Sequence, residues 1–328
     1  MNVARHLSCS SNDDCLVGFT GFVGRALLGQ RAFRGLFNSA NIEDLAGQSF
    51  STLVCAAAPA TMWIANANPE VDKANLDRIA KSIGKSKAER VVLISTIAVF
   101  EDAAGKYTET DAKYEKEKAY GRHRRELEIT LGSLTDRLHV IRLPALFGIG
   151  LKKNFVFDLI NPVPSFLRPD AFEGLSASLG ARNELALKAV YHFNSGLGMW
   201  ELNRELLEIT GVRSQLEHEV EELGYAAKYF TNSESSFQYY NVHRLAADIE
   251  WMVEQEIRSL NVCSEPLAAS EIHERLIGQR FSNTKPKVYR EDIRSDHATR
   301  FGSKSPYLYN RETVVRELGS YFLRAVGQ

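Results

Sequence analysis

The chain has 328 residues, of which 44% are hydrophobic and 25% charged, so it can bury a full core and is not expected to be disordered. Its formal net charge of -1 gives no general attraction to nucleic acid or to an anionic membrane surface. No apolar run reaches the length of a membrane-spanning helix, about 18 residues. The cysteines Cys9, Cys15, Cys55 and Cys263 are scattered without a C-x-x-C pair, so the sequence suggests neither a metal site nor a disulfide framework, and a cytoplasmic protein with reduced thiols is expected.

Short apolar runs alternate with helical patterns through the first half of the chain. The strands are predicted at 15–17, 36–37, 52–56, 91–95 and 139–143, and the helices at 23–30, 69–83 and 120–131. Within 69–83 the spacing places Val71, Leu76, Ile79, Ala80 and Ile83 on one buried helical face. The alternation predicts an α/β fold with a doubly wound parallel sheet that is covered on both faces.

The pattern changes between residues 162 and 236. Segments 185–190 and 202–209 look helical, and no strand alternation is visible, so we expect a smaller, mostly helical lobe. An extended segment at 237–242, a helix at 243–258 and a strand at 261–263 are expected to return to the sheet. The remainder is mixed, with helices near 270–277 and 311–323. The predicted sheet domain is therefore 14–161 with 237–264, and the predicted lobe is 162–236 with 265–328.

Three glycines follow the first strand with the spacing G-x-x-G-x-x-G. Gly18 permits a tight turn, Gly21 lets a pyrophosphate approach the backbone, and Gly24 allows the helix to pack closely on the strand. This spacing indicates a dinucleotide-binding Rossmann fold when a strand precedes the motif and a helix follows it, as here. The alternative is a tight turn that binds no ligand. The residues expected to contact the dinucleotide here are Gly18, Thr20, Gly21, Phe22, Val23 and Gly24.

The end of the second strand bears on which dinucleotide binds. An acid there would favour NAD, but the sequence has Asn38 and Ser39, while Arg25 and Arg34 could reach a 2′-phosphate. The sequence therefore leaves NAD and NADP open, with a slight preference for NADP. The third strand ends in small side chains, as is needed where a ribose lies against the backbone: Ala56, Ala57 and Ala58.

Four motifs in order carry a resemblance to a known family. They are the glycine turn, the segment from Ile94 to Phe100, the segment from Tyr120 to Arg124, and the segment from Arg142 to Gly148. The chain resembles the extended short-chain dehydrogenase/reductases, the NAD-dependent epimerase/dehydratase group that acts mostly on nucleotide sugars. The resemblance covers roughly residues 14–160, with a weaker return at 237–272, and it identifies the sheet domain as the dinucleotide-binding domain and the lobe as the substrate-binding part.

The resemblance also implies roles for individual residues. Thr96 would be the hydroxyl partner and Tyr120 the acid/base, and Asn75 and Pro144 would lie at the cofactor pocket. A free tyrosine has a pKa of about 10, so a nearby cation is needed to stabilise the tyrosinate. At the family's lysine position this chain has Arg124, which keeps the charge but cannot imitate a lysine that bonds both ribose hydroxyls and relays a proton.

Two alternatives remain open at the catalytic position. Tyr114 and Lys118 form a rival Y-x-x-x-K pair, but Tyr114 lies nearer to Thr96 than the family's spacing, and its charged surroundings are typical of a solvated surface. The departure at Arg124 also allows a protein that binds NAD(P) as a sensor or scaffold without efficient catalysis.

The substrate side departs from the family as well. Ala145 and Phe237 stand where the family has polar contacts to a diphosphate, and Lys152, Lys153 and Asn154 could supply them instead. Ile97 and Ala98 cannot titrate, which disfavours dehydration and leaves reduction or epimerisation of a sugar that is expected to be nucleotide-linked. The resemblance further implies a homodimer.

Overall fold

The computed structural model describes residues 13–327, which form two compact units, so Cys9 lies outside the described residues. The first unit comprises residues 13–150, 238–266 and 291–314, and the second comprises 151–237, 267–290 and 315–327. These bounds differ from the expected ones at 151–161 and 291–314. Segment 291–314 joins the first unit because the buried Gln238 side chain bonds the backbone N–H and C=O of Ile293, both at 2.8 Å.

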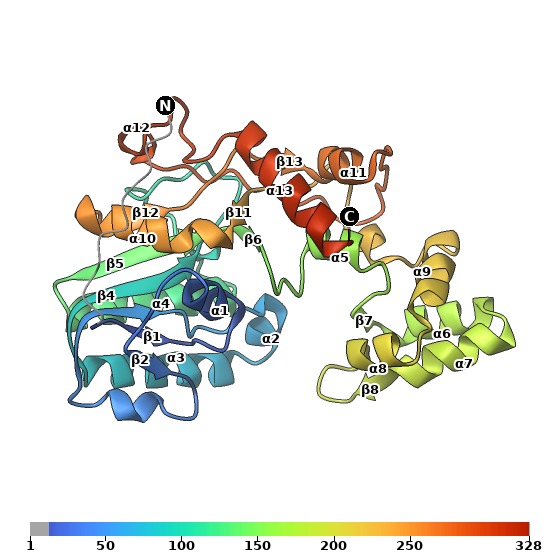
Figure 1. Cartoon of the computed structure of the whole chain (residues 1–328), viewed down its shortest axis with the longest axis horizontal. Coiled ribbons are helices and arrows are strands. Elements are labelled where there is room, and N and C mark those ends of the chain that lie inside the picture. The colour runs from blue at the N-terminus through green and yellow to red at the C-terminus, as the bar shows by residue number, and fades with distance from the viewer. Residues whose placement is uncertain (1–12, 328) are drawn as a thin grey trace. The chain divides into compact units, whose positions relative to one another are not determined.

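A six-stranded parallel sheet forms the centre of the first unit, with strand order β12-β5-β4-β3-β1-β2 (Figure 1). This confirms the predicted doubly wound α/β sheet. The elements of this unit are β1 (Cys15–Val17), α1 (Phe22–Leu28), β2 (Gly35–Phe37), η1 (Ile42–Leu45), β3 (Ser49–Cys55), α2 (Met62–Ala67), α3 (Pro69–Gly84), β4 (Lys87–Thr96), η2 (Ile97–Val99), α4 (Ala119–Leu134), β5 (Leu138–Leu143), β6 (Ala145–Phe147), β11 (Tyr239–Asn241), η4 (Val242–Arg244), α10 (Leu245–Glu254), β12 (Ser259–Asn261) and α12 (Ala298–Phe301).

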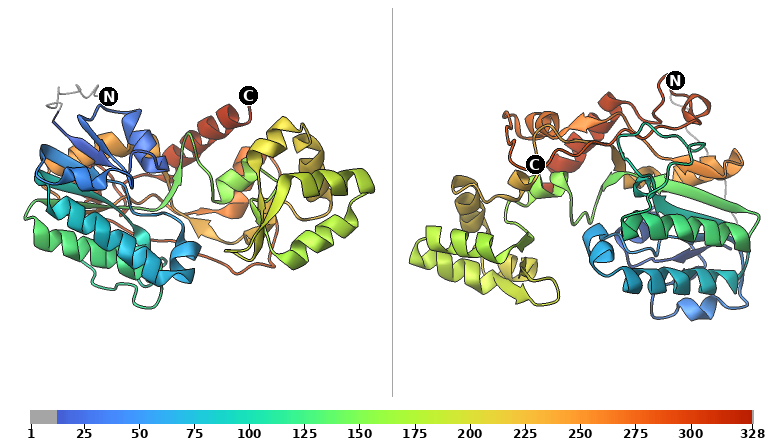
Figure 2. Two further views of the ribbon diagram at one scale, coloured as in Figure 1. Left: turned by 90° about the horizontal axis from the view of Figure 1, so that it is seen from below. Right: turned by 180° about the vertical axis from the view of Figure 1, so that it is seen from behind.

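Helices cover both faces of this sheet. Side chains alternate along each strand, and one face packs against α3 and α4, which lie side by side (Figure 2). Helix α10 covers the other face, and α1 adjoins it because the Gln30 side chain accepts the Ala246 N–H at 2.9 Å and donates to the Val242 carbonyl at 3.0 Å. Because the strands are parallel, the carboxyl ends of β1 to β5 meet at a single edge of the sheet, where ligands of such sheets bind.

Two details of the sheet unit differ from the sequence prediction. The buried face of α3 carries Asp72, Leu76, Ile79 and Ile83, whereas Val71 is 70% exposed, so the prediction for Val71 was wrong by one position. The last strand is β12, which begins two residues before the predicted one. Both errors arise because apolar residues at an element's end fit more than one register.

The second unit has its own core and a small sheet. Antiparallel strands in the order β7-β9-β8 pack beside α6 to α9, and the Phe172 and Trp200 rings stack at 4.0 Å. The unit is mostly helical, as predicted, and its short strands are an addition that the sequence did not indicate. Strand β8 runs from a buried Tyr191 to exposed His192 and Phe193, without the period-two alternation that would have marked it. Its elements are α5 (Phe155–Ile160), β7 (Phe166–Leu167), α6 (Pro169–Ser178), α7 (Ala181–Val190), β8 (Tyr191–Asn194), β9 (Met199–Leu202), α8 (Arg204–Ile209), α9 (Arg213–Glu222), η3 (Ala227–Phe230), β10 (Ser236–Phe237), β13 (Leu267–Ala268) and α11 (Ala269–Ile277).

The last helix, α13 (Arg311–Ala325), begins in the first unit and ends in the second. Across residues 13–327, none of the helices is both long enough and apolar enough to cross a bilayer.

Candidate functional site

The glycine turn is shaped by close backbone approaches. Gly18 has φ +90°, and a Cβ there would come within 2.5 Å of the Ala56 carbonyl oxygen, while a Cβ on Gly24 would overlap the Gly18 carbonyl. Gly21, which precedes α1, is exposed and would meet only the Gly18 oxygen, at an ordinary 3.5 Å. The two outer glycines are therefore required by packing, and Gly21 leaves its outer side open, as a backbone-bound pyrophosphate needs.

The loop after β2 closes on itself beside this turn. The Gly18 N–H donates to the Phe37 carbonyl at 2.7 Å, which ties β2 to the turn. Beyond Phe37, the Asn38 N–H donates to the Asn41 side chain at 2.7 Å, and the Asn38 side chain accepts the Ala40 N–H at 2.8 Å. Ser39 is left exposed at the tip of the loop.

The structure changes which arginines lie near that loop. Arg34 precedes β2 and pairs with Asp13 at 2.7 Å, at the opposite edge of the sheet, so the prediction that it reaches a 2′-phosphate was wrong. Arg25 stays at the turn, where its Nε donates to the Thr20 carbonyl at 2.8 Å. Arg78 of α3, which the sequence did not indicate, donates to the Ser39 carbonyl and pairs with Glu43 at 3.0 Å.

Thr96 and Tyr120 come from adjacent elements. Thr96 ends β4, and its hydroxyl accepts the Ala98 N–H at 3.2 Å, which begins η2. Tyr120 lies in the first turn of α4 and is 9% exposed; its N–H donates to the Asn66 side chain at 2.9 Å. A Cβ on Gly121 would overlap the Ala98 carbonyl, so glycine there lets α4 pack directly on η2. The structure thus brings the predicted pair together, and Asn66 is a contact that the sequence did not reveal.

Arg124 is buried and held from several sides. Its Nη1 and Nη2 donate to both carboxylate oxygens of Asp72, at 2.6 and 2.9 Å, and its guanidinium lies 3.9 Å from the centre of the Tyr120 ring. The remaining Nη contacts are to the carbonyl oxygens of Pro59, at 2.6 Å, and Tyr120, at 3.2 Å. The same carboxylate lies 2.9 Å from His123 Nδ1.

One polar atom of this group is unsatisfied. Among the described residues, the buried Nε of Arg124 has no hydrogen-bond partner. A guanidinium has five N–H donors, and the four Nη contacts use the others. An orphaned charged donor is costly, so its presence beside Tyr120 fits a site that receives an oxygen acceptor from a ligand, such as a ribose hydroxyl.

Burial dominates the electrostatics of the Tyr120 hydroxyl. Desolvation raises its pKa above the usual 10, and the charge of Asp72 raises it further. The charge of Arg124 and a hydrogen bond with Thr96 act in the opposite direction without overcoming burial. The hydroxyl is therefore a neutral proton donor at neutral pH.

The rival tyrosine occupies a different environment. Tyr114 stacks on Phe100 with ring centroids 5.8 Å apart, and the Arg125 guanidinium lies 3.9 Å from its ring centre. The charged residues around Tyr114 are exposed as predicted, namely Lys113, Lys116, Glu117 and Lys118, but the half-buried Tyr114 ring is packed in an aromatic and cationic layer. Its partner Lys118 precedes α4 and pairs with Glu115 at 3.4 Å.

A second buried ion pair holds the far half of α4. Glu128 receives Arg142 Nε and Nη2 at 3.0 and 2.8 Å, the Ser95 hydroxyl at 2.6 Å and Arg125 at 2.7 Å. Arg142 also lies 3.4 Å from the side chain of Asn261 in β12. This cluster joins α4 to strands β4, β5 and β12 behind Thr96.

The remaining predicted residues are placed as follows. Asn75 is half-buried on α3, and Pro144 is half-buried between β5 and β6. In the second unit Lys152 and Lys153 are exposed, while the Asn154 side chain accepts the Val156 and Phe157 N–H groups at 3.1 and 3.2 Å. Asn154 therefore caps α5 and occupies the N–H groups that were expected to face a phosphate.

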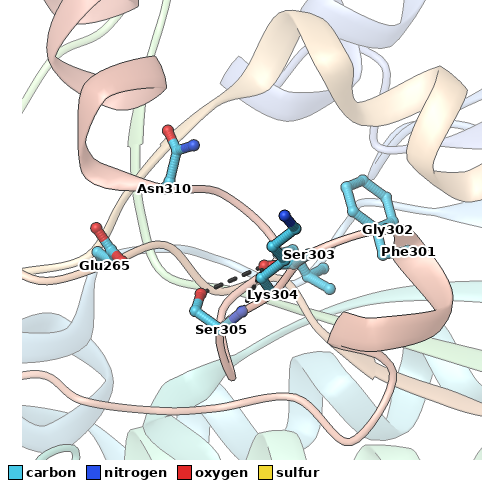
Figure 3. Close-up of a pocket in the computed structure, with 8 residues that line it drawn as sticks. Glu265, Phe301, Gly302, Ser303, Lys304, Ser305 and Asn310 are labelled. Carbon is cyan, nitrogen blue, oxygen red and sulfur yellow. Dashed lines mark hydrogen bonds between the residues drawn. The ribbon is translucent and has the colours of Figure 1, made fainter.

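A separate pocket of about 580 Å³ lies in the first unit (Figure 3). Polar groups that line this pocket are hydrogen-bonded within the protein. The Glu265 carboxylate accepts the Arg311 N–H at 2.8 Å, and the hydroxyls of Ser303 and Ser305 lie 3.3 Å apart. None of the predicted site residues lines it. The lining residues are Glu265, Phe301, Gly302, Ser303, Lys304, Ser305, Leu308 and Asn310.

Comparison with known proteins gives a fold and no close relative. No protein-family model and no curated protein matches the sequence. Among solved structures, the UDP-N-acetylglucosamine 4-epimerase of Methanobrevibacter ruminantium M1, in complex with UDP-N-acetylmuramic acid, is similar with a TM-score of 0.60 and 11% identity, covering 96% of this chain and 98% of that one. The dTDP-4-dehydrorhamnose reductase of Bacillus anthracis, in complex with NADP, has a TM-score of 0.58 and 11% identity, covering 97% and 100%. MoeE5, in complex with UDP-glucose and NAD, has a TM-score of 0.57 and 14% identity, covering 94% and 97%. The resemblance seen in the sequence is thereby confirmed at the level of the fold, over nearly the whole chain.

Proposed function

We propose that this chain is an NAD(P)-dependent oxidoreductase or epimerase that acts on a nucleotide-linked sugar. The observation that carries the proposal is the juxtaposition at one edge of the parallel sheet: the glycine turn follows β1, and Thr96, at the end of β4, lies next to a buried Tyr120. The fold shared with a UDP-N-acetylglucosamine epimerase and a dTDP-4-dehydrorhamnose reductase supports the same reaction class.

The roles of the side chains follow from their contacts. Tyr120 exchanges the proton at the reacting sugar oxygen, and Thr96 holds that oxygen by a second hydroxyl. Arg124 fixes the Tyr120 ring and presents its free Nε to the cofactor ribose. The nicotinamide, when bound, supplies or takes the hydride. Asn75, Pro144 and the alanines at 56–58 would line the cofactor.

The cofactor preference rests on the loop after β2. Arg25 lies at the glycine turn, and Arg78 contacts the Ser39 carbonyl. Neither Asn38 nor Ser39 is an acid that would bind a ribose 2′-hydroxyl, so NADP remains slightly favoured over NAD. Calorimetric titration with NADPH and NADH would check this. The Arg78→Ala variant should weaken NADPH binding and leave NADH binding unchanged.

The second unit is proposed to bind the substrate. Exposed Lys152 and Lys153 would contact its phosphates, with Asn154 holding the start of α5 in place. We also propose a homodimer through α3 and α4, since Val71 and Ile129 on these helices are 70% and 58% exposed. Light scattering of the purified protein would measure its mass, and a monomer at micromolar concentration would contradict the dimer.

The decisive experiment joins binding to turnover. Purified protein should bind NAD(H) or NADP(H). A reductase should lower the absorbance of the reduced cofactor with dTDP-4-dehydrorhamnose as a trial substrate. An epimerase returns the hydride to the sugar, so its product from UDP-glucose would be followed by NMR of the sugar instead. The Tyr120→Phe variant should bind the cofactor equally well and lose about 10²- to 10⁴-fold in rate, the usual contribution of a general acid or base. Full turnover in Tyr120→Phe would remove Tyr120 from the chemistry, and failure to bind any dinucleotide would overturn the proposed function.

A second candidate function is supported by Arg124. Its Nη groups are all engaged with Asp72, Pro59 and Tyr120, so it cannot grip both ribose hydroxyls as a lysine would. A sensor or scaffold that binds NAD(P) without turnover would need no such grip. Such a protein would bind the dinucleotide yet show no hydride transfer, and activity that first appears in Arg124→Lys would favour it.

A further inference from the structure

Asp72 provides a counter-charge that the reaction itself does not require. It comes from α3, is buried, and holds Arg124 through two hydrogen bonds of 2.6 and 2.9 Å. A lone cation beside Tyr120 would strongly stabilise the tyrosinate. Here the cation and the carboxylate form a neutral unit, so the stabilisation is largely cancelled.

The polar groups packed around Tyr120 and Arg124 come from four elements. Helix α4 contributes Arg124 and His123, and α3 contributes Asp72. Strand β4 contributes the uncharged Thr96, and α2 contributes the amide of Asn66, which bonds the Tyr120 backbone. Asp72 is thus the carboxylate that opposes Arg124 at this corner.

We infer that Asp72 is a positioning residue which keeps Tyr120 protonated by neutralising Arg124, and which thereby suits the site to reducing a keto-sugar. The inference rests on the proposed function. In the reduction, the carbonyl π bond would break as hydride from NAD(P)H adds to the carbon and the Tyr120 proton adds to the oxygen. The products would be NAD(P)⁺ and an alcohol. Solvent would then return a proton to Tyr120. Epimerisation begins instead with removal of a hydroxyl proton, for which the resting tyrosine is in the wrong form.

The burial of Tyr120 and the charge of Asp72 act in the same direction, since both raise the pKa of the hydroxyl. Removing the Asp72 charge would leave Arg124 unopposed at 3.9 Å from the ring centre. The Tyr120 titration should then move to lower pH by about 1 to 3 units, the usual effect of an opposite charge within 4–6 Å.

The test follows Tyr120 itself, in cofactor-free protein. Protein labelled with ¹³C at the tyrosine Cζ would be titrated by NMR, with the Tyr120 signal assigned by its loss in Tyr120→Phe. Asp72→Asn keeps the side-chain shape and should shift the titration downward. Glu128→Gln alters another buried carboxylate, which lies on α4 and pairs with Arg142 of β5, and should leave the Tyr120 titration in place.

A double-mutant cycle guards against a variant that merely unfolds. Arg124→Gln alone should move the Tyr120 titration upward, and Asp72→Asn with Arg124→Gln, which removes both charges, should return it close to the wild-type position. An unchanged titration in Asp72→Asn, or an equal shift in Glu128→Gln, would overturn the inference. Dinucleotide binding is measured separately, so a failure of the proposed function and a failure of this inference give different results.

Turnover provides a second readout if a keto-sugar substrate is found. In the wild type the reduction rate should be flat across neutral pH. In Asp72→Asn the fall in rate on the alkaline side should begin at a pH about 1 to 3 units lower, because the charge of Arg124 is no longer opposed. A purely structural role for Asp72 would lower the rate at every pH alike.

Discussion

Helix α4 takes part in two buried arginine–carboxylate pairs one helical turn apart: Arg124 with Asp72 nearer its start, here the near end, and Glu128 with Arg142 nearer its close, the far end. The two pairs differ in what is left unsatisfied. At the far end, both oxygens of Glu128 accept from Arg142, Arg125 and Ser95, and every nitrogen of Arg142 has a partner, so this pair is closed. The neighbouring Arg125 keeps a buried Nε without a partner among the described residues, but that side chain lies over the packed Tyr114 ring. At the near end, Arg124 keeps a buried Nε without a partner among the described residues, directly beside Tyr120. A closed pair serves the fold, whereas a pair with a free donor at a reactive hydroxyl indicates a ligand site.

The largest effect is expected from opening the closed pair. Glu128→Ala leaves Arg142 buried without its carboxylate, and the free energy of unfolding should fall by about 3–5 kcal/mol. Urea denaturation would measure this loss. The dinucleotide affinity of the folded protein should stay the same, because this pair faces strands β4 and β5.

Glu126→Ala is the matched control on the same helix. The Glu126 side chain is 40% exposed and lies 3.7 Å from Lys73 and 3.9 Å from Arg122, so its loss should cost at most about 1 kcal/mol. Equal losses for the two variants would show that the Glu128 cluster is no more important to the fold than a surface pair.

A smaller effect should come from the contact that sets Tyr120 against Thr96. Gly121→Ala places a Cβ into the Ala98 carbonyl, which must force α4 away from η2 at a cost of about 1–3 kcal/mol. Because Tyr120 is the preceding residue, the variant should also lose turnover beyond the loss in folded protein. Chemical denaturation and rates per folded molecule would separate the two effects.

Gly132→Ala provides the contrast at the far end of α4. A Cβ there meets Leu138 at an ordinary 3.8 Å, so the substitution should raise the free energy of unfolding by up to about 1 kcal/mol through helix propensity. If Gly121→Ala behaved like Gly132→Ala, the close packing of α4 on η2 would not govern Tyr120.

The sequence predicted the framework and the near-end residues, because their signals are local. A glycine triplet between a strand and a helix, and a Thr and Tyr in family order, are readable without tertiary contacts. Strand–helix alternation then predicts a parallel sheet, and in such a sheet the carboxyl ends of the strands, where Gly18 and Thr96 lie, meet at one edge. The order of the strands was not predicted.

The partners of Arg124 could not be predicted in the same way. Asp72 lies on a different helix, and assigning Val71 to the buried face of α3 hid it by one position. The available signal was the spacing of Asp72, which lies four residues before Leu76 and seven before Ile79 and so shares their apolar face. A carboxylate on a buried face needs a buried cation. The Asn66 contact depends on how two helices meet, which no local pattern encodes.

The last effect is a change, at acid pH, in the stability that the Glu128 pair contributes. Burial alone would raise the pKa of Glu128, but hydrogen bonds and charge from Arg142, with Ser95 and Arg125, outweigh it and hold the pKa below 4.5. A carboxylate with a depressed folded-state pKa stabilises the protein fully above the unfolded value, and this contribution is lost as pH falls through the folded-state pKa. The stability difference between wild type and Glu128→Gln should therefore be constant from pH 7 to about 5 and shrink below about pH 4.5. Urea denaturation at stepped pH would record it. A difference that stayed constant down to pH 3 would show that the Glu128 charge contributes nothing to the fold, and that the contrast between the two ends of α4 lies in packing alone.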